Sequence, residues 1–312
     1  MDFKKVTVLV DDSDIRLDRW FKRHHQHVAF TQIVKMARKK LIKINGKRCE
    51  ASTRVMEGDV ISFPEFETFS EVGKQEHKDK ISKQNRELIT NAVMYKDDDI
   101  IVLNKPSGLA VQGGTKIATS VDDLAECIKF EYDDKPKLVH RIDKETSGLL
   151  IMARKTVVAA QLAQLFRTRH ITKKYLALIR GVPKDLEGKI VSKISKVKIG
   201  KFERMVENEE GKTAITHYKV IDSAAKEYAL LELDIITGKT HQIRAQLAEM
   251  GTPIVGDDKY GSRTQSIGIL DKKLYLHAYK MDFGLNKKKY ELEADLPSYF
   301  EDALNTLALS VK

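Results

Sequence analysis

From residue 91 onward, short apolar runs alternate with longer segments in which apolar residues recur at helical spacing. The apolar runs predict strands at 100–103, 149–152, 175–179, 218–221 and 229–235. The helical spacing predicts helices at 121–130, 157–168 and 241–250. Residues 91–312 are therefore predicted to form one domain that mixes helices and strands.

The first 69 residues follow a different order, in which two helical patterns precede short strands. Within residues 16–25, Leu17, Trp20 and Phe21 lie at helical spacing, and a second helix around residue 35 has its apolar positions on one face. Strands are expected at 41–44 and 60–63, the first of them ending in an Asn-Gly turn. We predict a small domain over residues 1–69, with Trp20 in its core rather than on a surface that stacks on bases.

Between these two patterns lies a stretch that is polar and charged. Residues 70–86 read SEVGKQEHKDKISKQNR and contain almost no large apolar side chain. Such a composition does not support a buried core. We predict a polar linker over residues 70–90 that separates two independently folded units.

The composition is that of a chain that folds without cross-links. With 312 residues, of which 42% are hydrophobic, the chain can bury a large core and a small one. Its two cysteines, Cys49 and Cys127, belong to no disulfide or zinc pattern. No apolar run reaches the roughly 18 residues of a membrane span, and the N-terminus has no signal-peptide features. We expect a cytoplasmic protein without a metal or a membrane contact.

The positive charge is concentrated in the first domain. Residues 16–54 contain twelve Lys or Arg and two acids, Asp18 and Glu50, so this segment has a net charge of 12 − 2 = +10, equal to that of the whole chain. A local excess of this size indicates a polyanionic partner, and we predict nucleic acid. The residues expected to contact it are Arg16, Lys35, Arg38 and Lys39.

Candidate chemistry is found in residues 140–155, HRIDKETSGLLIMARK. Arg141 and Asp143 precede a turn of small residues at 146–148, which leads into the apolar strand at 149–152. This order predicts a carboxylate held on a loop beside the core. An isolated Arg-x-Asp is more often a solvated surface turn, so the interpretation depends on the rest of the chain.

The sequence HRIDKETSGLL resembles the signature of the pseudouridine synthases that modify ribosomal and transfer RNA. Three further segments resemble this family in the expected order, at 97–114, 173–181 and 237–261. The Arg-Leu-Asp sequence at 16–18 and the turn at 42–46 are similar to the S4 RNA-binding module. The resemblance implies an α+β fold: a small S4-like α/β domain, then a catalytic domain over 91–312 with a mostly antiparallel curved sheet, surrounding helices and an RNA-binding cleft.

The resemblance also assigns roles to individual residues. It makes Asp143 the catalytic carboxylate and pairs it with Arg244, whose charge would keep Asp143 ionised and oriented. Tyr175 would stack on the target uracil and is a candidate for handling the proton that leaves C5. Arg141 would fill the space left by the flipped base, with a phosphate contact as the alternative. The reaction needs no metal, no cofactor and no bound nucleotide.

Several points remain open on the sequence. Asp143 can add to the ribose or base, or take a proton from C2′. The expected partner is large-subunit ribosomal RNA, with transfer RNA as the nearest alternative, and the protein is expected to be a monomer. We expect residues 192–205 to be a basic, RNA-facing loop. Lys105 and His140 are expected to be structural or RNA-contacting, and His241 is given no catalytic role.

Two functions of other classes are alternatives on the sequence. A non-catalytic RNA-binding assembly factor would keep the fold and lose the site, but Asp143, Tyr175 and Arg244 are all present. A glycoside or nucleoside hydrolase would need a second placed carboxylate, and Glu145 is predicted to lie on the surface. The Gly-Lys-Thr at 238–240 is not a phosphate-binding P-loop, because Leu233 stands where that motif requires glycine.

Overall fold

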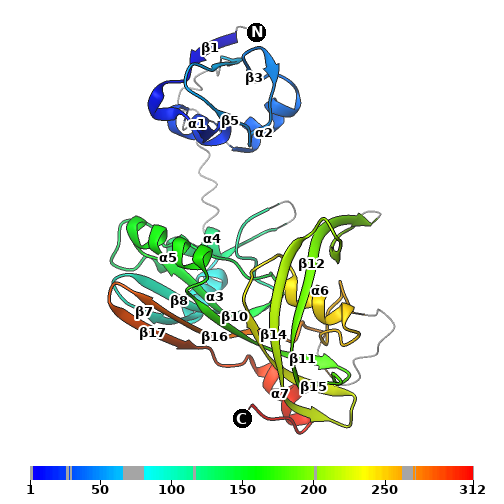
Figure 1. Cartoon of the computed structure of the whole chain (residues 1–312). Helices are drawn as coiled ribbons and strands as arrows, with labels where there is room; N and C mark the ends of the chain where they lie inside the picture. The colour runs from blue at the N-terminus through cyan, green and yellow to red at the C-terminus, as the bar shows by residue number, and fades with distance from the viewer. Residues whose placement is uncertain are drawn as a thin grey trace. The chain divides into compact units, whose positions relative to one another are not determined.

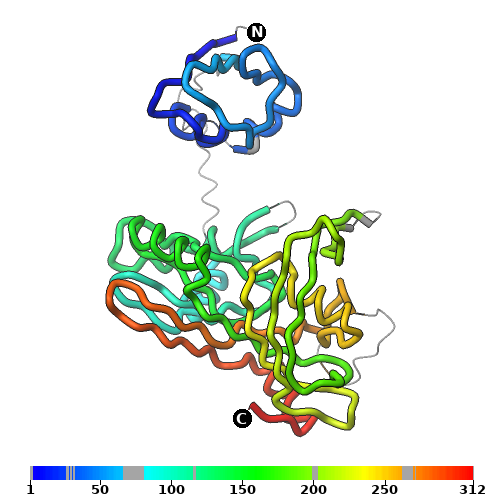
Figure 2. Tube along the Cα trace, in the orientation of Figure 1, coloured from blue at the N-terminus to red at the C-terminus, as the bar shows by residue number. Residues whose placement is uncertain are grey.

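Apolar residues collect in separate cores on either side of residue 78, so the structure divides into two units, Met1–Lys78 and Asp79–Lys312. This computed structural model describes residues 3–25, 28, 30–65, 81–114, 117–199, 202–261, 270 and 272–311. Figures 1 and 2 trace the chain through both units.

The first unit combines two helices with two small sheets. Its elements are β1 (Phe3–Thr7), η1 (Val10–Asp12), β2 (Ile15–Arg16), α1 (Leu17–His24), α2 (Phe30–Arg38), β3 (Lys43–Ile44), β4 (Lys47–Arg48), β5 (Arg54–Val55) and β6 (Val60–Pro64). The larger sheet has the order β1-β6-β3-β4, and β2 pairs with β5. Asn45 and Gly46, which connect β3 and β4, both have positive φ, as a tight Asn-Gly hairpin turn requires.

The core of the first unit is formed by the helix faces that the sequence predicts. Leu17, Trp20 and Phe21 of α1 pack with Ile33 of α2 in one cluster. The ring of Trp20 is 1% exposed and meets Phe21 edge to face at 5.2 Å. The prediction that Trp20 is a core residue is confirmed.

The described end of the predicted linker at 70–90 is helical. Helix α3 (Lys83–Asn91) starts after Ser82, whose hydroxyl accepts the backbone N–H of Asn85 at 3.2 Å. Its Ile89 is buried in the core of the second unit. Because one apolar position and a capping serine are enough to dock this short helix, residues 83–90 belong to the second unit rather than to a linker. Residues 66–80 lie outside the described part of the chain.

The second unit is organised around an eleven-stranded sheet. Its strands are β7 (Val93–Lys96), β8 (Ile100–Lys105), β9 (Lys137–Leu138), β10 (Ser147–Ala153), β11 (Thr172–Arg180), β12 (Glu187–Ile199), β13 (Phe202–Glu207), β14 (Lys212–Ala224), β15 (Tyr228–Ile235), β16 (Leu276–Leu285) and β17 (Lys288–Glu293). The order is β13-β12-β14-β15-β11-β16-β10-β8-β7, with β17 on β16 and β9 on β10. Among the strands that the structure describes in this sheet, β10 and β16 pair in parallel and the other pairs are antiparallel, which confirms the predicted mostly antiparallel sheet.

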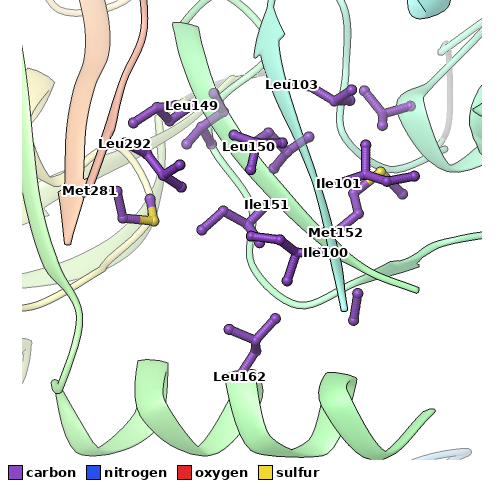
Figure 3. Packing of buried hydrophobic residues seen from close by; sticks show 14 of the residues in the cluster. Ile100, Ile101, Leu103, Leu149, Leu150, Ile151, Met152, Leu162, Met281 and Leu292 are labelled. Atoms are coloured by element: carbon purple, nitrogen blue, oxygen red, sulfur yellow. The ribbon is translucent and has the colours of Figure 1, made fainter. Parts of the chain in front are cut away.

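Helices cover this sheet and complete its cores. Besides α3, they are α4 (Val121–Leu124), η2 (Ala125–Ile128), α5 (Thr156–Thr168), α6 (Gln242–Glu249) and α7 (Ser298–Thr306). Figure 3 shows Leu162 of α5 facing the apolar residues of β8 and β10, with Met281 and Leu292 from β16 and β17 beside them. Of the helices that the structure describes, none has the length and apolarity to cross a bilayer.

The segment predicted as a basic loop at 192–205 is instead a β-hairpin. Its strands β12 and β13 pair from Ile194 with Glu207 to Ile199 with Phe202. The reason is visible in the sequence Lys-Val-Lys-Ile at 196–199, where β-branched residues alternate with lysines at the two-residue period of a strand. The loop prediction was wrong because the charge of this segment was given more weight than its periodicity.

Gly148 allows β10 to approach β16. Its φ is +102°, and a Cβ atom at this position would lie 2.3 Å from the carbonyl oxygen of Ala278 on β16. Two backbones in such close contact leave no room for a side chain. The glycine that follows Ser147 is therefore a requirement of the parallel β10–β16 pair.

We expect Gly148→Ala to destabilise the second unit by roughly 3 kcal/mol or more, because it combines backbone strain with a clash against main-chain atoms. Gly284→Ala is the matched control, since no atom lies within 4 Å of its added Cβ and its φ is not positive. Urea unfolding of both variants measures the difference. Equal unfolding midpoints would contradict the close packing of β10 on β16.

Candidate active site

Asp143 lies on a loop between β9 and β10, and the residues just before it are anchored. Ile142 is buried in the core, and Nε2 of His140 accepts the backbone N–H of Ile151 at 2.8 Å. The ring of His140 also stacks on Phe166. These contacts fix the residues next to Asp143, so its carboxylate is held in place although it belongs to a loop.

Lys105 connects this loop to the one that follows β8. Its side chain is fully buried, and its ammonium donates to the carbonyls of Pro106, Leu109 and Lys144 at 2.8, 2.8 and 3.0 Å. Burial lowers the pKa of Lys105 to about 7, although the charges of Glu145 and Asp143 oppose the shift. Because three carbonyls match the three N–H groups of an ammonium, Lys105 has a structural position and does not face RNA.

Arg244 is in the first turn of α6, with its guanidinium almost completely buried. Nε and Nη2 donate to the two carboxylate oxygens of Asp257 at 2.7 and 2.8 Å. Nη1 lies 3.5 Å from Oδ2 of Asp143. The structure therefore brings Arg244 and Asp143 together, but the main partner of the guanidinium is Asp257.

Asp257 was not singled out from the sequence. Its side chain is fully buried, and it also accepts the backbone N–H groups of Lys259 and Tyr260. Burial opposes ionisation, but the hydrogen bonds and charge of Arg244 outweigh it, so the pKa of Asp257 lies below its usual range. The sequence could not identify it because Asp258 follows directly, and only the fold decides which carboxylate points inward.

Helix α6 is held against β14 by a buried polar network. Gln242 accepts from the hydroxyl of Thr237 at 2.7 Å and donates to Thr216 at 2.9 Å. Thr216 in turn donates to Gln246 at 2.6 Å. Satisfied buried hydrogen bonds of this kind specify one position of the helix, and hence of Arg244.

Tyr175 lies on β11, where the pairing with β16 shifts register between Lys174 and Tyr175. Such an irregularity redirects a strand side chain. Burial and the negative charge of Asp143 raise the pKa of Tyr175. The ring is therefore a neutral phenol at neutral pH, suited to stacking and a weak proton acceptor.

Asp143, Tyr175 and Arg244 line one pocket of about 450 Å³. Cationic side chains also line it, namely Arg141, Arg167, Arg169, Lys173 and Lys239. Arg141 is exposed, whereas Glu145 is not among the lining residues. The pocket combines an acid, an arginine and an aromatic ring with cations that suit a polyanionic substrate.

His241 also lines the pocket, although the sequence gave it no role. Its Nε2 lies 3.8 Å from Oδ2 of Asp143, and its Nδ1 lies 2.9 Å from the hydroxyl of Tyr260. Burial lowers the pKa of His241 to about 4, so the ring is neutral at pH 7. In the described residues, no group of three or more His, Cys, Asp or Glu is placed to hold a metal ion.

The remaining predicted RNA contacts belong to the first unit. Lys35, Arg38 and Lys39 are exposed on α2 and directly after it. Arg16 is exposed but held by Asp18, to which it donates two hydrogen bonds of 3.2 and 2.6 Å. The three residues at and after α2 are therefore freer to meet phosphates than Arg16.

Comparisons with known proteins identify sequences and a structure that are similar to this chain. A family model described as RNA pseudouridylate synthase matches residues 99–249. The ribosomal large subunit pseudouridine synthase C of Rickettsia felis is 38% identical over 92% of this chain and 95% of its own length. The protein of that name from Vibrio cholerae is 31% identical over 94% and 93%. The solved structure of human RNA pseudouridylate synthase domain containing 4 covers 72% of this chain and 96% of its own, with 29% identity and a TM-score of 0.62.

We expect Asp257→Asn to lower the stability of the second unit by about 3–5 kcal/mol at neutral pH, because Arg244 would lose the partner of a buried charge. The depressed pKa of Asp257 contributes stability above its unfolded pKa, about 3.9, and this contribution is lost as pH falls through the lower folded pKa. The difference between variant and wild type should therefore shrink below about pH 4.

Asp258→Asn is the matched control, because this neighbouring carboxylate is exposed. It should change the free energy of unfolding by no more than about 0.5 kcal/mol. Denaturant unfolding of both variants between pH 3 and pH 7 makes the comparison. Similar losses of unfolding free energy in the two variants would show that the ion pair of Arg244 with Asp257 does not stabilise the fold.

Proposed function

The chain belongs to the RNA pseudouridylate synthase family and is therefore an isomerase, and from this premise we propose that it converts particular uridines of large-subunit ribosomal RNA to pseudouridine with Asp143 as the catalytic carboxylate. The observation that carries the proposal is the meeting of Asp143 with Arg244 and Tyr175 in one pocket. The target is supported by the relatives, which are named for the large ribosomal subunit.

The reaction begins with a uridine that leaves the RNA stack. Unstacking costs a few kcal/mol, and a planar guanidinium can occupy the vacated space. Arg141 is exposed at the pocket and immediately precedes Ile142 and Asp143 in the chain. The extruded uracil then stacks on Tyr175, which also lines the pocket.

Asp143 then assists cleavage of the bond between uracil and C1′. Its carboxylate either adds to the sugar or base, or removes the proton from C2′. Both routes need a carboxylate in a fixed orientation, which the anchored loop and Arg244 provide. The uracil turns in the pocket, and C5 joins C1′ as the bond to the carboxylate breaks or the C2′ proton is returned. The proton on C5 is then released, and the freed N1 takes up a proton. Tyr175 is assigned to stacking because its raised pKa reflects a buried neutral phenol.

The first unit is proposed to be an S4-like module that holds the RNA. Its support is the combination of two helices, a small sheet and exposed cations at and after α2. Transfer RNA is the alternative substrate of the same chemistry. The substrate also supports a cytoplasmic location, which agrees with the free cysteines Cys49 and Cys127.

A hydrolase is disfavoured by the arrangement of carboxylates. General acid and base hydrolysis requires two available carboxylates on opposite sides of the bond. Asp257 is buried and occupied by Arg244, and Glu145 does not line the pocket. A non-catalytic assembly factor would not need Asp143 and Tyr175 in one pocket with Arg244.

We expect Asp143→Asn to reduce single-turnover pseudouridine formation by roughly a thousandfold or more, because the amide keeps the shape and loses the charge. RNA affinity should stay within about threefold, since the phosphate-binding cations are unchanged. Conversion is followed by pseudouridine mapping on ribosomal RNA isolated from cells that lack the protein, and binding by filter retention.

Glu145→Gln provides the matched control and should react at the wild-type rate. Substantial turnover by Asp143→Asn would overturn the role of Asp143. Rapid conversion of transfer RNA together with none in ribosomal RNA would reject the proposed substrate and leave the chemistry intact.

The first unit can be tested through the salt dependence of binding. Each phosphate contact contributes roughly 0.7 to 0.9 to the slope of log affinity against log salt concentration. Replacing Lys35, Arg38 and Lys39 by Gln should therefore make the slope shallower by about two units. Turnover of RNA already bound should remain, because these residues and the pocket belong to different units.

Lys83, Lys287 and Lys289 are exposed in the second unit, and their replacement by Gln changes the net charge equally. This triple variant should leave the slope close to that of the wild type. If both triple variants flatten the slope to the same extent, the effect is one of total charge, and the first unit has no specific role in RNA binding.

A further inference from the structure

Asp143 is approached by a hydrogen-bonded pair, Tyr260 and His241, that the mechanism above does not use. His241 precedes α6 with its Nε2 3.8 Å from Oδ2 of Asp143. On its other side, Nδ1 lies 2.9 Å from the hydroxyl of Tyr260. The hydroxyl of Tyr260 also accepts the backbone N–H of Met205 in β13, at 2.9 Å.

This chain of contacts favours one tautomer of the imidazole. Tyr260 accepts the backbone N–H of Met205, which leaves its own O–H to donate to Nδ1 of His241. The ring is neutral, because burial outweighs the charge of Asp143 while Arg244 and Lys259 disfavour a further cation. A neutral ring that accepts at Nδ1 carries its proton on Nε2, the nitrogen that faces Asp143.

The backbone at His241 supports a specific role. Its φ is +51°, a left-handed conformation that is uncommon for residues other than glycine and asparagine. The carbonyl of His241 accepts the N–H of Ala245, and Lys239 accepts the N–H of Gln242. The start of α6 is thus held so that this ring is directed into the pocket.

We propose that His241 is a positioning residue for Asp143, that Tyr260 imposes the tautomer which donates from Nε2, and that Tyr260 ties this contact to strand β13 of the basic hairpin. The inference rests on the proposed role of Asp143. The 3.8 Å separation shortens to a hydrogen bond when substrate is bound, as catalytic contacts commonly do.

The arrangement distinguishes the two oxygens of Asp143. Nε2 of His241 and Nη1 of Arg244 both face Oδ2, at 3.8 and 3.5 Å. Two donors on one oxygen turn the other, Oδ1, toward the ribose and uracil. His241 thereby selects the orientation of the carboxylate, and Arg244 supplies the charge.

The contact with β13 connects this orientation to RNA binding. Strand β13 is the edge of the sheet, and its Arg204 lies 5.9 Å from the ring of Tyr260. The paired strand β12 carries Lys196 and Lys198. RNA that binds these cations sets the position of Met205, and through Tyr260 it completes the contact of His241 with Asp143.

Tyr260→Phe tests the pair with the loss of a single oxygen atom. We expect the single-turnover rate constant at saturating enzyme to fall roughly ten- to hundredfold, the range for losing the hydrogen bond of His241 to the charged Asp143, with the apparent Kd for RNA unchanged within about threefold. Tyr218→Phe is the control, because it removes a hydroxyl that donates to the carbonyl of Asp185 and lies outside the pocket lining. It should react at the wild-type rate.

Two substitutions of His241 by amide side chains separate the loss of the hydrogen-bond donor from damage to the fold. His241→Asn suits the left-handed backbone, but its side chain is too short to reach Asp143. His241→Gln places an N–H near the position that Nε2 occupies in the wild type. We therefore expect His241→Gln to react faster than His241→Asn, although glutamine suits the left-handed backbone less well. Equal rates for these two variants, or a wild-type rate for Tyr260→Phe, would overturn the proposal.

A measurement without turnover completes the test. In protein labelled with ¹⁵N-histidine, His241 is identified among the nine histidines as the signal missing from His241→Gln. At pH 7 it should show the Nε2–H tautomer, and Tyr260→Phe should shift it toward a mixture. An Nδ1–H tautomer or an imidazolium in the wild type rejects the proposal. An active Asp143→Asn variant would instead reject the proposed catalytic role of Asp143, whichever tautomer is found.

Discussion

The buried positive charge of Arg244 is the constraint on which the rest of the site depends. A guanidinium removed from water without a partner is strongly unfavourable, so the fold has to bring carboxylates to it. Asp257 accepts hydrogen bonds from Nε and Nη2 of this guanidinium, and Asp143 lies beside the remaining nitrogen, Nη1. Compensation of one charge thereby brings together the loop before β10, helix α6 and the segment after α6, and the pocket lies where these segments meet.

Directional polar contacts hold these segments, in addition to apolar packing. Lys105 joins two loops through three carbonyls, and Gln242 fixes α6 through two threonine hydroxyls. Apolar side chains tolerate small shifts, whereas a buried donor that loses its acceptor carries the full cost of desolvation. The carboxylate of Asp143 consequently has a defined direction, although no helix or strand contains it.

Affinity and chemistry are carried by different kinds of residues in this arrangement. The net charge of the chain equals that of residues 16–54, in the first unit, while the pocket places one acid, Asp143, among six Lys or Arg side chains. Long-range attraction to phosphate depends on excess charge, whereas bond cleavage depends on the placement of single groups. A basic hairpin, β12–β13, connects the two requirements because its edge strand contacts Tyr260.

The sequence by itself determined the predicted strands and helices of the second unit, the core position of Trp20, and the family to which the motif around Asp143 points. These properties depend on local periodicity and on short motifs. The hairpin at 192–205 and the helix at 83–91 also have local signals, namely the alternation at 196–199 and the capping Ser82, but the charge of both segments obscured them. The sequence did not determine the inward orientation of Asp257 rather than Asp258, which depends on contacts between separate segments of the chain. The partner of Arg244 lies thirteen residues away and beyond the end of α6, and a buried charge selects its counterion only when the chain has folded around it.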